Sequence, residues 1–79
     1  MNNHYKQLVN LLLERHSFSL AKTNGENKTA ADNSLILGLS GLQQAAFCAD
    51  DSEALTEINE LISQMDIDGY IQPYNLAVV

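Results

Sequence analysis

The chain has 79 residues, of which 46% are hydrophobic and 18% are charged, and a formal net charge of −6. This length allows a single domain, residues 1–79, with a thin core, and the composition is typical of a folded protein rather than a disordered one. Cys48 is the one cysteine, so an internal disulfide is excluded, and its apolar neighbours predict that it lies in the core or at its boundary. The longest apolar runs fall far short of the ~20 residues that cross a membrane. Because the first residues also lack the layout of a signal peptide, we expect a cytoplasmic protein.

The charges are unevenly distributed along the chain. All four basic residues lie in the first 28 positions, whereas residues 32–79 hold eight carboxylates and no lysine or arginine. Nucleic acids and anionic lipids are bound mainly through neutralised phosphates. We therefore expect no membrane partner, and any contact with nucleic acid would have to come from the four basic residues, which are Lys6, Arg15, Lys22 and Lys28.

The first part of the chain predicts a helix followed by extended structure. Residues 3–16 carry apolar side chains at helical spacing. Residues 17–22 alternate polar and apolar side chains, which is typical of a half-buried strand. Asn24-Gly25 then favours a tight turn, because both residues tolerate positive φ angles. The polar residues 26–33 fit either a short return strand or an ordered loop.

Residues 34–49 fit two different structures. An apolar stripe at helical spacing favours a helix over most of this stretch. Gly38 and Gly41 each weaken that helix by about 1 kcal/mol relative to alanine. The alternative is a buried strand over residues 34–39, followed by a shorter helix over residues 41–49. We favour the helix, and the alternative stays open at this point.

The clearest element is a helix over residues 51–66. Apolar side chains form a seam along it, made by Leu55, Ile58, Leu61, Ile62 and Met65. Asp50 and Glu53 have the spacing of a capping box at its start. Gly69 is well placed to end the helix in a left-handed cap.

The last residues predict a hairpin. Residues 70–71 and 76–79 resemble two short strands, and Pro73 stands at its favoured position in a turn between them. The expected fold class is therefore α+β, a small single domain with about three helices and a short antiparallel hairpin. The same order also fits a winged-helix-like domain, with a recognition helix over residues 52–65 and a wing over residues 69–79.

The charges disfavour the winged-helix alternative as a nucleic-acid-associated regulator. A recognition helix needs Lys, Arg, Asn or Gln to contact phosphates and base edges. The helix expected here would instead expose Glu53, Glu57 and Glu60. Nucleic acid is therefore not the expected partner of this surface.

Glu53, Glu57 and Glu60 share one side of the 51–66 helix, with no neighbouring lysine to offset them. Such a face is either solvated surface or a docking surface for a basic partner. Tyr70 and Tyr74 are further candidate interface anchors. We therefore expect a small, acidic, non-catalytic protein-protein interaction module, a regulator or inhibitor, that contacts its partner through these five residues. The thin core also makes a homo-oligomer, such as a homodimer, reasonable.

We identify no catalytic, cofactor or metal residues. His4 and His16 lie about three turns apart on the first helix, so they cannot share a metal. Residues 37–42 resemble the attachment loop of acyl carrier proteins, in which Asp-Ser-Leu follows Leu-Gly. That resemblance implies a phosphopantetheine carrier, but Gly41 stands where the carrier serine belongs and Ser40 stands where the aspartate belongs. A degenerate acyl-carrier-like protein is thus the remaining alternative, and we expect no bound cofactor.

Overall fold

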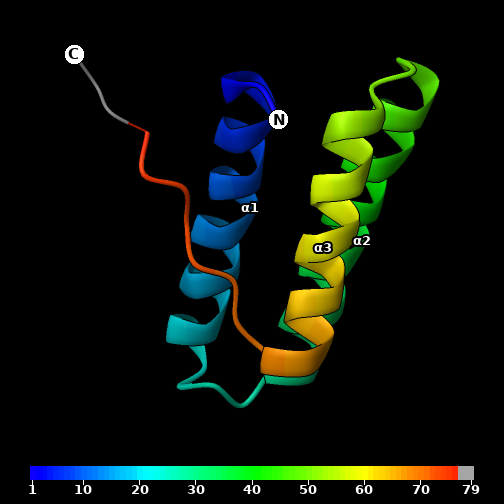
Figure 1. Ribbon diagram of the computed structural model, residues 1–79. Helices are drawn as coiled ribbons and strands as arrows, with labels where there is room; N and C mark the ends of the chain where they lie inside the picture. Colours follow the sequence, from blue (N-terminus) through cyan, green and yellow to red (C-terminus); the bar gives the residue numbers. More distant parts are fainter. Residues whose placement is uncertain (77–79) are drawn as a thin grey trace.

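The computed structural model describes residues 1–76 and is all-α over that range. Helix α1 spans Asn3–Lys22, α2 spans Lys28–Cys48 and α3 spans Ser52–Asp68. Each helix runs antiparallel to the one before it, and the segment after α3 returns along α1 (Figure 1). Residues 1–76 contain no strand, so the expected α+β fold with a hairpin, and its winged-helix-like variant, is wrong.

Helix α2 is the central element and packs against both α1 and α3. Residues 69–76, which we call the tail, run back along α1 (Figure 1), and their Ile71 and Tyr74 side chains pack into or against the core. The main core cluster accordingly draws on all three helices and the tail; its buried members are Val9, Leu13, Leu35, Leu39, Leu61, Met65 and Ile71. The tail is therefore part of the hydrophobic core and not an appendage.

A second, smaller core cluster joins the carboxyl end of α2 to the amino-terminal half of α3. Its buried residues are Ala46, Ala54 and Ile58. The small alanine side chains let the two helices approach closely around Ile58. The predicted seam of the last helix is confirmed where Ile58, Leu61 and Met65 are buried.

The predicted strand over residues 17–22 is wrong, because α1 continues to Lys22. An alternation over six residues is a weak signal when a helical stripe continues through it. Val9 and Leu13 are buried, and His16 and Leu20 continue the same stripe with half-buried side chains. The helix therefore keeps one face toward α2 for its whole length.

Residues 34–40 are helical, which decides between the two structures left open by the sequence. Asn24 and Gly25 adopt positive φ angles of 53° and 81° in the turn between α1 and α2, as the sequence predicted for a tight turn.

Gly38 lies inside α2, where it packs against α1. A Cβ atom at this position would stand 2.7 Å from Leu12 Cδ2 on α1. The missing side chain thus permits a close approach of the two helices.

The start and end of α3 follow the sequence signals in part. Asp51, and not Asp50, caps the helix, and its side chain accepts from the Ala54 amide at 3.1 Å. Gly69 ends the helix with a φ of 68°, as predicted for a left-handed cap. The segment that follows has no regular structure up to residue 76, and residues 77–79 of the expected second strand lie outside the described residues.

The tail is extended but pairs with a side chain and not with a strand. The Asn10 side chain of α1 accepts from the Tyr74 amide at 2.8 Å and donates to the Tyr74 carbonyl at 2.9 Å. These two bonds satisfy backbone groups that a hairpin ladder would otherwise use. Burial of Ile71 in the main core cluster fixes the end of the tail that is nearer to α3.

Candidate functional site

Three of the five predicted site residues lie together near the first residue of the chain. The α-ammonium group of Met1 lies 3.1 Å from Glu53 Oε1 and 3.2 Å from Glu57 Oε1. The Tyr74 hydroxyl donates to Glu57 Oε2 at 2.5 Å. The fold therefore joins Glu53, Glu57 and Tyr74 in a single cluster with Met1.

The cluster brings one positive group, the Met1 ammonium, together with two carboxylates. Hydrogen bonds to Glu53 and Glu57 raise the pKa of the Met1 ammonium above its ordinary value of 8.0. The Tyr74 hydroxyl lowers the pKa of Glu57 from its ordinary 4.5. Burial, followed by the Glu57 carboxylate, raises the pKa of Tyr74 far above 10.0. At neutral pH Glu57 is thus an ionised acceptor with two partners inside the fold.

Asn10 of α1 belongs to the same region and was not among the predicted site residues. Its side chain holds the Tyr74 backbone, while the ammonium group of Lys6 lies 5.5 Å from the centroid of the Tyr74 ring. The sequence offered no signal for this contact, because Asn10 and Tyr74 are 64 positions apart. These contacts tie the tail to α1 and α3 together.

Glu60 lies at the middle of α3, outside this cluster. The exposed side of α3 around and beyond it forms a shallow hollow of about 470 Å³, lined by Thr56, Asn59, Glu60, Ser63, Gln64, Ile67 and Asp68. Ile67 is 80% exposed, although it is a large apolar residue. We call the surface made by Glu60, Ile67 and Asp68 the α3 end surface.

The α3 end surface carries negative charge at an unfavourable place. The last turn of α3 contains Asp66 and Asp68 and no basic residue. The carboxyl end of a helix dipole is itself partly negative, so carboxylates there are destabilising. Within residues 1–76, neither of these aspartates nor Glu60 forms an ion pair. The local field is therefore negative and uncompensated.

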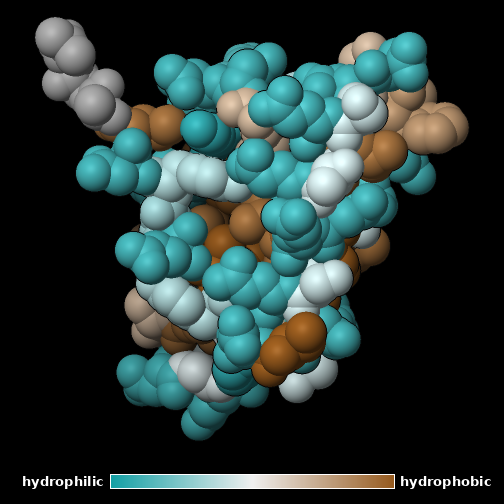
Figure 2. Space-filling view, viewed as in Figure 1, coloured by the Kyte–Doolittle hydropathy of each residue, from teal (hydrophilic) through white to brown (hydrophobic). Residues whose placement is uncertain are grey.

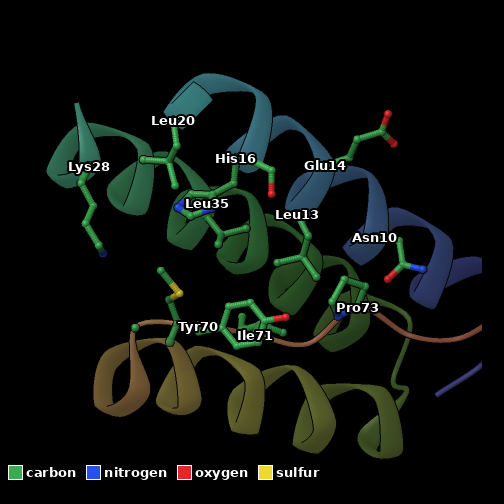
Figure 3. Close-up of a pocket in the computed structure, with 13 residues that line it drawn as sticks. Asn10, Leu13, Glu14, His16, Leu20, Lys28, Leu35, Tyr70, Ile71 and Pro73 are labelled. Atoms are coloured by element: carbon green, nitrogen blue, oxygen red, sulfur yellow. The ribbon is translucent and has the colours of Figure 1, made fainter. Parts of the chain in front are cut away.

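Tyr70 lies apart from the other predicted residues, beside a cavity of about 520 Å³ between α1, α2, α3 and the tail. Leu13, Leu20 and Leu35 point into this cavity from the helices, and the Tyr70 ring covers one side (Figure 3). Figure 2 shows apolar atoms at the surface in the hollow between α1 and α3. The Tyr70 side is open to solvent, since this residue is 62% exposed.

A polar group lies at one end of the cavity. His16 Nε2 lies 2.7 Å from Asp32 Oδ1, and the Lys28 ammonium donates to Asp32 Oδ2 at 2.5 Å. The bond from Lys28, ahead of that from His16, lowers the pKa of Asp32 from its ordinary 3.8. With Asp32 ionised, His16 Nε2 is the donor in this pair. The arrangement offers hydrogen-bonding groups beside an apolar wall.

A further surface that the sequence did not single out lies on the solvent side of α1. Leu11 and Phe18 are 51% and 64% exposed. Arg15 lies between them on the same side, where Leu11, Glu14, Arg15 and Phe18 line a hollow of about 280 Å³. The Lys22 ammonium lies 5.0 Å from the centroid of the Phe18 ring. We call the set Leu11, Arg15, Phe18 and Lys22 the α1 outer stripe.

Within residues 1–76, no group of three His, Cys, Asp or Glu side chains could hold a metal ion. None of the three described helices is long and apolar enough to span a membrane. Cys48, expected from its apolar neighbours to lie in the core or at its boundary, is exposed at the end of α2.

Comparisons with known proteins give a family and no activity. A family model described as "Domain of unknown function (DUF4754)" matches residues 1–79. Searches of curated proteins and of solved structures returned no significant match. The family match covers the whole chain, but its description names no substrate, partner or reaction.

Proposed function

The chain belongs to the DUF4754 family, and we propose that it is a non-catalytic protein-binding module that recognises a basic partner surface through its α3 end surface. The observation that carries this proposal is Ile67, which is 80% exposed at the acidic end of α3. An exposed aliphatic side chain beside acidic residues combines an apolar anchor with polar neighbours, as interfaces commonly do.

The electrostatics of α3 support a cationic partner. Each carboxylate in the last turn of a helix costs about 0.3–1 kcal/mol at low ionic strength. A lysine or arginine brought by a partner would remove this cost at Asp66 and Asp68 and pair with Glu60. Complementary charge also accelerates encounter and selects the partner. Binding would therefore stabilise α3 as well as the complex.

The structure changes which of the predicted residues are useful for docking. Glu53 and Glu57 bind the Met1 ammonium, and Glu57 also binds Tyr74. A partner would have to break these contacts in order to use Glu57. Glu60 has no such contact within residues 1–76. Among the predicted residues, the proposal therefore rests on Glu60 and treats the Glu57 cluster as structural.

The proposal is tested by affinity capture with a variant of the α3 end surface. Glu60→Lys with Ile67→Ser reverses one charge and removes the apolar anchor. The matched control is Glu26→Lys with Leu37→Ser, because Glu26 is exposed in the turn before α2 and Leu37 is 73% exposed on α2. Both variants change exposed residues, so both should fold, which circular dichroism verifies.

The expected result is a partner with a basic surface that the original protein and the control retain. Recovery by Glu60→Lys/Ile67→Ser should fall at least tenfold, and recovery by the original protein should fall with added salt. Equal recovery by both variants would refute the α3 end surface as the docking site. A substrate turned over by the protein would refute the non-catalytic assignment.

A further inference from the structure

We propose that a second copy of this chain is a partner of the α3 end surface, and that it docks through its α1 outer stripe. This inference rests on the proposed function and names one occupant for the same surface. The two surfaces are different parts of the chain, so each copy carries both halves of the contact. Such a contact is head-to-tail rather than symmetric.

The α1 outer stripe carries the basic side chains that the α3 end surface lacks. Arg15 and Lys22 are exposed and lie on either side of Phe18, which is 64% exposed. The Lys22 ammonium already lies over the Phe18 ring, so cation and aromatic group form one unit. Glu14 also borders the hollow next to Phe18, and it is the one carboxylate among the residues lining it.

The spacing of charges on the two helices also matches. Arg15 and Lys22 are seven residues apart, which corresponds to about 10 Å along a helix. Glu60 and Asp68 are eight residues apart, which corresponds to about 12 Å. Two cations can therefore face two carboxylates across the contact. Phe18 and Ile67, both exposed, supply an apolar contact beside the charged pairs.

The net charge of −6 opposes the approach of two copies. At an ionic strength of about 0.15 M the Debye length is about 8 Å, so repulsion between whole molecules is largely screened. Ion pairs in direct contact are screened less. Two short helix faces also bury less surface than a standard interface of about 1,600 Å². We therefore expect weak association, with a dissociation constant of about 100 μM.

The test uses two variants that each disable one surface. Arg15→Gln with Phe18→Ser disables the α1 outer stripe, and Glu60→Gln with Ile67→Ser disables the α3 end surface. All four residues are exposed, so folding should be retained. Neutral replacements are chosen because they create no new complementary pair between the two variants. Sedimentation is measured from about 0.05 to 1 mM for each protein and for their equimolar mixture.

For a head-to-tail contact, the average mass of the original protein rises with concentration and each variant stays at the mass of one chain. The mixture then forms a dimer of one copy of each variant and grows no further, because only one functional pair of surfaces remains. A constant single-chain mass for the original protein would overturn the inference. So would assembly by either variant alone, or a mixture that stays monomeric.

The same experiment separates this inference from the proposed function. If the original protein remains monomeric but still retains a different basic partner through Glu60 and Ile67, the second copy is excluded as the occupant. The docking function of the surface then stands. If the capture experiment fails while the mixture forms its dimer, the surface serves self-association alone.

Discussion

At the scale of single residues, the side chain of Asn10 connects α1 to the tail. It makes both hydrogen bonds to the backbone of Tyr74 and thereby holds the tail against α1. A hydrogen bond typically contributes about 0.5–1.5 kcal/mol, and a buried group left without a partner costs more. One side chain thus connects the first helix to the end of the described chain.

We expect Asn10→Ala to lower the free energy of unfolding by about 1–3 kcal/mol, because two hydrogen bonds to the tail are lost together. Urea denaturation measures the loss, and exchange of the Tyr74 amide hydrogen should become much faster. Gln7→Ala is the control, since Gln7 is exposed on the same helix. Equal effects of the two substitutions would show that the tail does not depend on Asn10.

The pair formed by Glu57 and Tyr74 predicts how stability depends on pH. The folded-state pKa of Glu57 is lowered, so its contribution is present above about 4.5 and is lost as the pH falls further. The folded-state pKa of Tyr74 is raised, so its contribution is present below about 10 and is lost as the pH rises further. Stability from this pair is therefore greatest between these limits.

Urea denaturation of the original protein and of Glu57→Gln from pH 7 to pH 3 tests the acidic limit. The difference in the free energy of unfolding should shrink as the pH falls below 4.5. Tyr74→Phe should show the opposite dependence, with the difference shrinking above pH 10. Differences that stay constant across these ranges would contradict the assigned hydrogen bond.

At the scale of elements, the contact between α1 and α2 is governed by a glycine. A Cβ atom on Gly38 would meet Leu12 Cδ2 at 2.7 Å, whereas one on Gly41 would meet nothing within 4 Å. Both glycines lie inside α2. They therefore have the same intrinsic effect on the helix and different effects on packing.

Gly41→Ala should raise the free energy of unfolding by about 0.5–1 kcal/mol, because alanine is the better helix former. Gly38→Ala should leave the protein about 1–3 kcal/mol less stable than Gly41→Ala, because Leu12 must move. Thermal or urea denaturation of the two variants measures the difference. An equal gain from both substitutions would refute the close approach at Gly38.

How much of each element the sequence could reveal depended on the length of its pattern. The helix around Ile58 and Leu61 was predictable, because its seam continues for several turns and Gly69 marks its end. Residues 17–22 were not, because six alternating residues resemble a strand, and beyond His16 only Leu20 continues the helical stripe. From the sequence alone Gly38 only weakens the predicted helix, because no local signal shows that Leu12 packs against this position.

The candidate site was predictable in its charge but not in its contacts. The acidic residues of α3 are visible in the sequence, and Glu60 lies exposed as expected. The hydrogen bonds of Glu57 with Met1 and Tyr74 were not predictable, because these residues are 56 and 17 positions away in the sequence. Ile67 was also overlooked, because an apolar residue near a helix end is normally assigned to the core.

At the scale of the whole molecule, the uneven distribution of charge along the sequence becomes a distribution in space. Arg15 and Lys22 lie on the solvent side of α1, whereas the acidic residues concentrate on α3. The tail packs against the core through Ile71 and Tyr74 and leaves Phe18 on α1 and Ile67 on α3 exposed. These two faces are the surfaces that the proposed docking and self-association would use.

The most direct measurement of the central claim is the dissociation constant of the captured partner for the original protein and for the two matched variants. We expect Glu60→Lys/Ile67→Ser to raise this constant at least tenfold, which corresponds to about 1.4 kcal/mol. Glu26→Lys/Leu37→Ser should leave it unchanged within about twofold. If the control variant weakens binding as much as the α3 variant does, the α3 end surface is not the docking site.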